Sequence, residues 1–308
     1  MQNTVIHTEH LGKIFKRALK QKFIALKDLS LDIERGEVFG FLGPNGAGKT
    51  TTIKILVNLI FPTSGNAWIL NKPCSDPKSR KHIGYLPEMS SLFDFLTFEE
   101  ILHFAGRTQG MNKADIRKRT DELAETLDMV GTKKVRIRKF SKGMQQRTGL
   151  AYALIGNPDV LILDEPMSGL DPIGRKDFVD LINRLKGEGK TIFFSSHVLS
   201  DIENVCDRVG ILVKGQLKKV GKISEMLHAS SDDVCIKISK LDGQSKDCFE
   251  KISATMQMDN STSNICVSKD KLDVTMGMIK KLDAKIVSID TKRKTLEDVF
   301  LEVVNGNS

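Results

Sequence analysis

Residues 43–50, Gly-Pro-Asn-Gly-Ala-Gly-Lys-Thr, match the pattern G-x-x-x-x-G-K-[ST] at every fixed position. The apolar run Val38–Leu42 leads directly into them, which predicts a strand, a glycine-rich turn and then a helix beginning near Lys49. Glycines let successive backbone N–H groups point into one concavity, where a side chain would block the approach of an anion. The stretch therefore predicts a phosphate-binding loop that holds a nucleoside triphosphate.

The fixed positions of this loop have different predicted tasks. The glycines form the turn, Lys49 reaches the β- and γ-phosphates, and Thr50 places its hydroxyl on Mg²⁺. The helix that follows directs the positive end of its dipole at the anion. The predicted nucleotide-binding positions of the loop are Gly43, Asn45, Gly46, Gly48, Lys49, Thr50 and Thr51.

A second apolar run, Val160–Leu163, ends in the two carboxylates Asp164 and Glu165. This pattern is typical of a buried central strand whose carboxyl end opens into a binding site. We expect Asp164 to hold Mg²⁺ through water. Glu165 is the candidate general base that polarises the attacking water.

Length and composition limit the class of protein. A chain of 308 residues exceeds one typical compact core, so we expect a large and a smaller domain. No apolar run approaches the roughly 18 residues of a membrane-spanning helix, and the N-terminus lacks the layout of a signal peptide, which predicts a cytoplasmic protein. The five cysteines form no C-x-x-C pair, so we expect reduced thiols and no metal site built from them.

The net charge of +8 is unevenly placed, because residues 1–227 carry 35 basic and 26 acidic side chains. Two basic clusters, Lys113–Arg119 and Lys133–Lys139, contribute to this excess. Each is a solvated face or, alternatively, attracts an anionic membrane surface or nucleic acid. Neither has interleaved aromatic residues that would stack on bases, so we expect no specific nucleic-acid partner.

Three more motifs follow the phosphate loop in a fixed order. They are Phe140–Arg147 (FSKGMQQR), Ser168–Asp171 (SGLD), and His197 after the β-rich run Phe193–Ser196. With GPNGAGKTT and LILDEP, this series over roughly residues 4–225 resembles the ATPase subunits of ABC transporters. The resemblance implies ATP and Mg²⁺ as cofactors and an α/β P-loop NTPase core with an antiparallel β subdomain. It places this core in residues 1–227 and a helical subdomain at about 88–158.

The resemblance also assigns residues that act between two subunits. Ser141 and Gly143, with Gln145, resemble the signature motif, which binds the γ-phosphate of an ATP held by the opposite subunit. Asp171 resembles the loop that crosses the dimer interface. His197 resembles the switch histidine, which contacts the γ-phosphate and fixes the water. The catalytic candidates are accordingly Glu165, His197 and Lys49.

The adenine base is held in this family by stacking on an aromatic residue upstream of the phosphate loop. Phe15 is the first candidate, because Leu11–Phe15 has the family's spacing. Lys16–Lys22 resembles an insertion, so Phe23 stays a second candidate. Stacking discriminates weakly among bases, since every base has a π-face, and the preference for ATP is therefore implied by the resemblance alone.

Two departures from the usual family pattern bear on function. The family usually has glutamine where this chain has Glu88, after Tyr85-Leu86-Pro87. A carboxylate also accepts hydrogen bonds from metal-bound water, so we expect Glu88 to join Thr50 and Asp164 at the metal and to alter the metal or pH dependence. The signature reads Ser-Lys-Gly-Met-Gln instead of Leu-Ser-Gly-Gly-Gln, which is similar to ATPases of exporters with separately encoded membrane subunits.

The resemblance therefore implies an exporter ATPase, bound to a membrane permease at the inner face of the cell membrane. A homodimer is the simpler expectation, because every catalytic motif is in this one chain, and a heterodimer stays open. The alternative is a soluble ABC-type ATPase that remodels a protein, nucleic acid or ribosome.

Two regions of the sequence lie outside these motifs and have predicted roles of their own. Leu92–Leu96 is apolar for a loop, and it lines a groove for a helix of the membrane partner or packs in the core. Residues 228–308 alternate strand-like and helix-like stretches, including a helix-like stretch at Asp247–Ala254 and a short strand near Met256–Met258. This alternation predicts an accessory α+β domain of ferredoxin-like type, for dimer contact or regulation.

Overall fold

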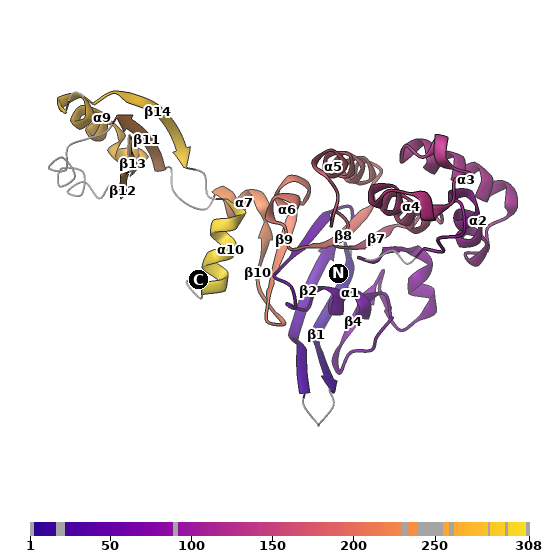
Figure 1. The fold of residues 1–308 in the computed structure, drawn as a ribbon. Coiled ribbons are helices and arrows are strands. Elements are labelled where there is room, and N and C mark those ends of the chain that lie inside the picture. Colours follow the sequence, from indigo (N-terminus) through magenta and orange to yellow (C-terminus); the bar gives the residue numbers. More distant parts are fainter. Residues whose placement is uncertain are drawn as a thin grey trace. The chain divides into compact units, whose positions relative to one another are not determined.

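The structure is a computed structural model that describes residues 3–16, 22–88, 92–228, 233–239, 255–258, 262–282, 284–292 and 295–305. The chain divides into two compact units, Met1–Ile223 with Val303–Ser308, and Ser224–Glu302. Figure 1 shows the strands and helices of both. No helix within the described ranges is long and apolar enough to cross a membrane.

The first sheet of the larger unit is antiparallel, with strand order β2-β1-β4-β5. Strands β1 (Thr4–Lys16) and β2 (Lys22–Glu34) form a long hairpin, followed in the sheet by β4 (Ser64–Ile69) and β5 (Lys72–Pro73). In β2, Leu29, Leu31 and Ile33 alternate with exposed residues and lie in one hydrophobic core, as expected for a sheet with one covered face. This sheet is the antiparallel β subdomain.

The second sheet of this unit has six strands in the order β10-β9-β3-β8-β7-β6. The bounds are β3 Val38–Leu42, β6 Ile83–Leu86, β7 Val160–Asp164, β8 Thr191–Ser196, β9 Arg208–Val213 and β10 Gln216–Lys222. All neighbours pair in parallel except β10 with β9. Every residue of β3, β7 and β8 is buried, as in the centre of a parallel sheet. The carboxyl ends of these three strands therefore meet at one edge.

One set of helices surrounds this sheet. A second set forms a separate group, which lies between β6 and β7 in the sequence. Around the sheet are α1 (Lys49–Leu56), α5 (Pro172–Gly187) and α6 (Leu199–Val205), and α7 (Ile223–His228) follows β10. The other group is α2 (Phe98–Thr108), α3 (Lys113–Thr126) and α4 (Lys142–Leu154). A capping box of Thr97 and Glu100 begins α2, and Asn112 caps α3. This group is the helical subdomain.

The smaller unit contains an antiparallel sheet of order β12-β13-β11-β14. Its elements are β11 Asp233–Ser239, β12 Thr255–Met258, β13 Thr262–Ser268, α9 Leu272–Lys281 and β14 Ile286–Lys292, and α10 Leu296–Asn305 follows. Ile236, Ile265 and Ile279 of β11, β13 and α9 share its hydrophobic core. The predicted strand near Met256–Met258 is present as β12. The predicted helix at Asp247–Ala254 lies outside the described residues.

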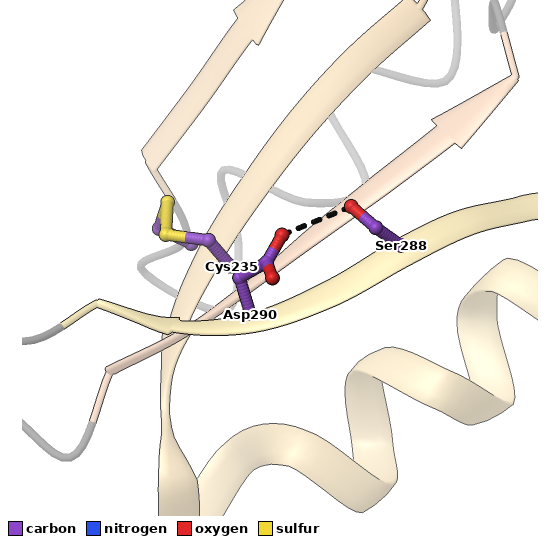
Figure 2. Close-up of a disulfide and its surroundings, with 4 residues drawn as sticks. Cys235, Ser288 and Asp290 are labelled. Atoms are coloured by element: carbon purple, nitrogen blue, oxygen red, sulfur yellow. Dashed lines mark hydrogen bonds between the residues drawn. A yellow bond between two sulfur atoms is a disulfide. The ribbon is translucent and has the colours of Figure 1, made fainter.

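The expectation of reduced thiols is wrong for two cysteines. Cys235 of β11 and Cys266 of β13 are joined by a disulfide, which Figure 2 shows beside Ser288 and Asp290 of β14. The antiparallel register places the two cysteines directly opposite each other with their Cα atoms 4.0 Å apart, and a separation of 31 residues in the sequence hides this proximity. Cys74 and Cys206 are unpaired thiols, and burial raises the pKa of each.

Candidate functional site

The predicted phosphate-binding loop joins β3 to α1, and α1 begins at Lys49. Gly46 and Gly48 have φ angles of +79° and +113°, which side chains rarely adopt. A Cβ atom on Gly48 would also lie 2.6 Å from the carbonyl oxygen of Ala25. The first turn of α1 contains no acidic residue, so its N–H groups and dipole are suited to an anion.

Lys49 is buried at the base of this loop, with 5% of its surface exposed. Its Nζ donates to the carbonyl oxygen of Gly43 at 2.7 Å and lies 3.2 Å from Oε1 of Glu165. A buried ammonium needs such partners, because burial without them is costly. The contacts hold Lys49 between the loop and the end of β7, where it can bind a phosphate oxygen.

Two oxygen donors predicted to bind the metal meet beside the loop. The hydroxyl of Thr50 donates to Oδ1 of Asp164 at 3.2 Å. Asp164 is 1% exposed, and burial raises the pKa of its carboxyl group. A buried carboxylate and a hydroxyl at this spacing fit Mg²⁺, which prefers oxygen ligands and retains some of its water.

Glu165 follows β7 and is held by contacts to both of its carboxylate oxygens. Oε1 contacts Lys49, and Oε2 lies 2.8 Å from Nδ1 of His197, which follows β8. The backbone of Glu165 has a φ angle of +48°, a conformation that is uncommon for residues other than glycine and is concentrated at functional sites. The three predicted catalytic residues are thus in one connected group.

Ser195, which the sequence reasoning missed, connects the two acidic residues. Its hydroxyl donates to Oδ1 of Asp164 at 2.7 Å and accepts a hydrogen bond from the backbone N–H of Glu165 at 3.0 Å. Its side chain has no exposed surface. The register of β7 and β8 pairs Ser195 directly with Asp164. In the sequence, its only signal is its position two residues before His197.

We expect Ser195→Ala to lower the rate of ATP hydrolysis about tenfold or more and to raise the Mg²⁺ concentration needed for half-maximal activity. The change leaves a buried N–H and a carboxylate each short of one partner, which costs about 1–3 kcal/mol per group. Magnesium titrations of the hydrolysis rate measure both effects. Ser196→Ala is the matched control, since among the described residues its hydroxyl forms hydrogen bonds only with the backbone of Val198. A lower Tm with an unchanged Mg²⁺ requirement would show that Ser195 is structural only.

A cavity of about 310 Å³ lies at the phosphate loop. It is lined by Phe23, Ala25, residues 45–51, Glu88 and Glu165. Glu88 thus lies at the same cavity as Thr50. The second aromatic candidate, Phe23, lines the cavity, whereas the first candidate, Phe15, pairs with Phe23 across the hairpin and does not line it.

The signature and interface residues lie at a different cavity. Ser141, Gly143 and Asp171 line a space of about 910 Å³ that includes no residue of the phosphate loop. Ser141 caps α4 by accepting from the N–H of Met144, and Asp171 caps α5. The remaining predicted signature residue, Gln145, donates from Nε2 to the carbonyl oxygen of Phe140 at 3.4 Å. One chain therefore keeps the signature residues apart from its own phosphate loop.

Comparisons with known proteins point to one family. A family model described as ABC transporter matches residues 26–168. An ABC transporter ATP-binding protein of Synechocystis sp. (strain PCC 6803) is 38% identical over 309 residues, covering 98% of this chain and 85% of that protein. The linearmycin resistance ATP-binding protein LnrL of Bacillus subtilis (strain 168) is 33% identical over 228 residues, covering 73% of this chain and 72% of that protein.

Solved structures show the same core fold. The ATP-binding subunit of an ABC transporter superposes with a TM-score of 0.65 at 30% identity, covering 73% of this chain and 93% of that one. A dimeric ATP-binding cassette bound to ADP and phosphate in a post-hydrolysis state has a TM-score of 0.66 at 26% identity, covering 71% and 98%. The predicted P-loop NTPase fold with its two subdomains is confirmed. The chain therefore belongs to the family of ABC transporter ATP-binding subunits, and it is an ATPase.

Proposed function

We propose that this ATPase is the energy-coupling subunit of an exporter and works with a separately encoded membrane permease at the inner face of the cell membrane. The observation that carries the proposal is an exposed aromatic surface beside the helical subdomain. The linearmycin resistance relative supports the direction of transport, because resistance fits removal of a compound from the cell. The competing function is a soluble remodelling ATPase.

We propose a hydrolytic cycle in which ATP closes two chains head to tail. Within one chain the triphosphate is held by the phosphate loop and Lys49, the adenine stacks on Phe23, and Mg²⁺ is bound by Thr50 and Asp164. The separation of the two cavities supports this cycle, because Ser141 and Gly143 line a cavity that includes no residue of their own phosphate loop. Donors from both chains then surround the γ-phosphate. Together they stabilise the negative charge that develops there in the transition state.

In this cycle Glu165 orients and polarises the attacking water, and His197 holds its carboxylate. The ion pair between Glu165 and Lys49 supports this role, because Lys49 is the residue expected to reach the γ-phosphate. Mg²⁺ neutralises charge on the phosphate oxygens when it is bound. Glu88, which lines the same cavity, senses the metal and transmits its presence to the helical subdomain.

The aromatic surface consists of Phe93, Phe95 and Phe104. They are 48%, 61% and 45% exposed. The ring centroids of Phe93 and Phe95, and of Phe93 and Phe104, are 5.8 Å apart. The exposure is incompatible with the alternative that Phe93 and Phe95 pack in the core. Clustered exposed aromatic side chains mark binding sites, and a helix of a permease is the partner we propose.

We expect the double variant Phe93→Ser and Phe95→Ser to reduce transport-coupled activity at least tenfold while basal ATP hydrolysis stays within about twofold. Truncating aromatic anchors of an interface costs about 2 kcal/mol or more each. Transport in cells and hydrolysis by the purified chain measure the two effects. The control is Val130→Ser, another exposed apolar residue between α3 and α4. Full transport by the double variant would contradict docking at this surface.

Affinity purification of the tagged chain from its native host in mild detergent and MgATP tests the proposed function. The chain carries Glu165→Gln to prolong the ATP-bound state, and the same chain carrying Lys49→Ala as well is the matched control. Recovery of a multi-span membrane protein with the first chain, reduced in the second, supports the exporter subunit. Recovery of ribosomes or soluble proteins only, with the chain absent from membranes, would favour the remodelling ATPase.

A further inference from the structure

The far end of the β1–β2 hairpin carries exposed aliphatic and basic side chains. Strand β4 pairs with β1 no farther than Gly12, so beyond it the two strands form a two-stranded ribbon. The last cross-strand pairs are Ile14 with Ile24, Phe15 with Phe23, and Lys16 with Lys22. Ile14 and Ile24 are 37% and 47% exposed, although they lie directly opposite each other.

The pairing divides these side chains between two faces of the ribbon. Successive side chains of a strand point to opposite faces, and directly paired residues share a face. Phe23 therefore shares one face with Phe15 and lines the nucleotide cavity. The opposite face carries Ile14, Lys16, Lys22 and Ile24, a set that we call the hairpin patch.

The charges of the hairpin patch are unbalanced. Lys16 and Lys22 are directly paired, and like charges in this position destabilise a hairpin. Neither has an acidic partner among the residues that the structure describes. Elsewhere in the same two strands, His7 and His10 each pair with an aspartate across the strands. An anionic ligand at the hairpin patch would relieve the repulsion.

The sequence around the patch is basic, and a neighbouring loop carries a large apolar side chain. Residues 13–27 contain six basic and no acidic residues, namely Lys13, Lys16, Arg17, Lys20, Lys22 and Lys27. Lys13 donates to the carbonyl oxygen of Phe61, and the N–H of Ile14 donates to Thr63, so the loop after α1 lies against this ribbon. Phe61 in that loop is 69% exposed. The described residues of this region combine lysines with exposed large apolar side chains.

We propose that the hairpin patch binds the surface of a bilayer that contains anionic phospholipids. Lysine ammonium groups are attracted to such headgroups, and apolar side chains beside them enter the boundary between headgroups and acyl chains. Proteins that bind single-stranded nucleic acid combine basic with aromatic side chains that stack on bases, whereas the patch has isoleucines and Phe15 and Phe23 lie on the other face. The contact is separate from any permease and gives the ATPase a second, direct attachment to the membrane.

Flotation of the purified full-length chain with lipid vesicles tests this binding. One set of vesicles is phosphatidylcholine alone, and the other contains about one third phosphatidylglycerol. We expect binding to the anionic vesicles only, with at least tenfold weaker partition for Lys16→Glu with Lys22→Glu and for Ile14→Ser with Ile24→Ser. Lys113→Glu with Lys118→Glu makes the same charge change in the basic cluster of α3 and should stay within about twofold of the parent chain. Unchanged basal ATP hydrolysis verifies the fold of each variant.

Other results would overturn the proposal. One is equal binding of the parent chain to both vesicle types. Another is unchanged partition of the variant with Lys16→Glu and Lys22→Glu. A third is a loss of partition in the α3 control as large as the loss in the patch variants. Tighter binding to a single-stranded oligonucleotide than to vesicles, lost with the same two reversals, would assign the patch to nucleic acid. Because the vesicles contain no permease, failure here leaves the proposed exporter subunit intact.

Discussion

Glu165→Gln should reduce ATP hydrolysis about 10²- to 10⁴-fold, the usual contribution of a general base, while ATP still binds. Glutamine retains the size of the side chain and an oxygen for His197, but it lacks the charge that polarises water. The loss of the 3.2 Å ion pair leaves Lys49 its carbonyl partners at Gly43 and Pro44, so the phosphate loop keeps its shape. Phosphate release and equilibrium nucleotide binding measure the two properties.

The same variant also tests the head-to-tail dimer. Without hydrolysis, MgATP should keep the Glu165→Gln chain dimeric in size-exclusion chromatography. Adding Ser141→Arg should return it to a monomer, because the cavity lined by Ser141 would no longer admit a γ-phosphate from the second chain. Glu203→Gln, at an exposed position of α6, should hydrolyse ATP normally. Retention of a tenth or more of the hydrolysis rate by Glu165→Gln would exclude Glu165 as the general base.

Asp164→Asn should reduce Mg²⁺-dependent hydrolysis about 100-fold or more and, without metal, make the folded chain more stable. Burial raises the pKa of Asp164 in the folded state above the ordinary value of an aspartate, 3.8. A raised acid pKa means that the folded state binds the proton more tightly, so ionisation of Asp164 destabilises the fold as pH rises. Asparagine removes this cost and keeps an oxygen that accepts from Thr50 and Ser195.

The gain in stability of Asp164→Asn over the parent chain should therefore increase as pH rises. It should be small below about pH 4, near the pKa of an unfolded aspartate, and should grow as pH rises until it is constant above the raised pKa. Thermal melts in EDTA from pH 4 to neutral measure it, with exposed Asp180→Asn as the control. A lower Tm of Asp164→Asn at neutral pH would show that the charge stabilises the site. Mg²⁺ should reverse the order, because it binds the ionised carboxylate.

The parts of the site that lie in one continuous segment could be predicted from the sequence. The phosphate loop, the strand before it and the helix from Lys49 are all present. The strand ending at Asp164 is also present. Local patterns such as glycine spacing and apolar runs directly reflect backbone conformation and burial, so neither requires knowledge of distant residues.

Contacts between distant segments could not be predicted in the same way. Ser195 lies beside Asp164 because β7 and β8 are neighbours in one register, and a serine in a strand has no pattern of its own. Cys235 meets Cys266 for the same reason. Phe15 and Phe23 were both candidates for the adenine, and the path of the hairpin places Phe23 at the cavity.

The sequence alone determined the P-loop ATPase family, the order of its motifs and the identity of the acidic and basic groups, because each depends on residues at fixed separations along the chain. The tertiary structure decided how those groups meet: which oxygen of Glu165 faces Lys49 and which faces His197, and which cavity the signature residues line. It also decided which hairpin face carries isoleucine and lysine. These outcomes depend on strand order and register, and a register shifted by one residue would move every side chain to the other face.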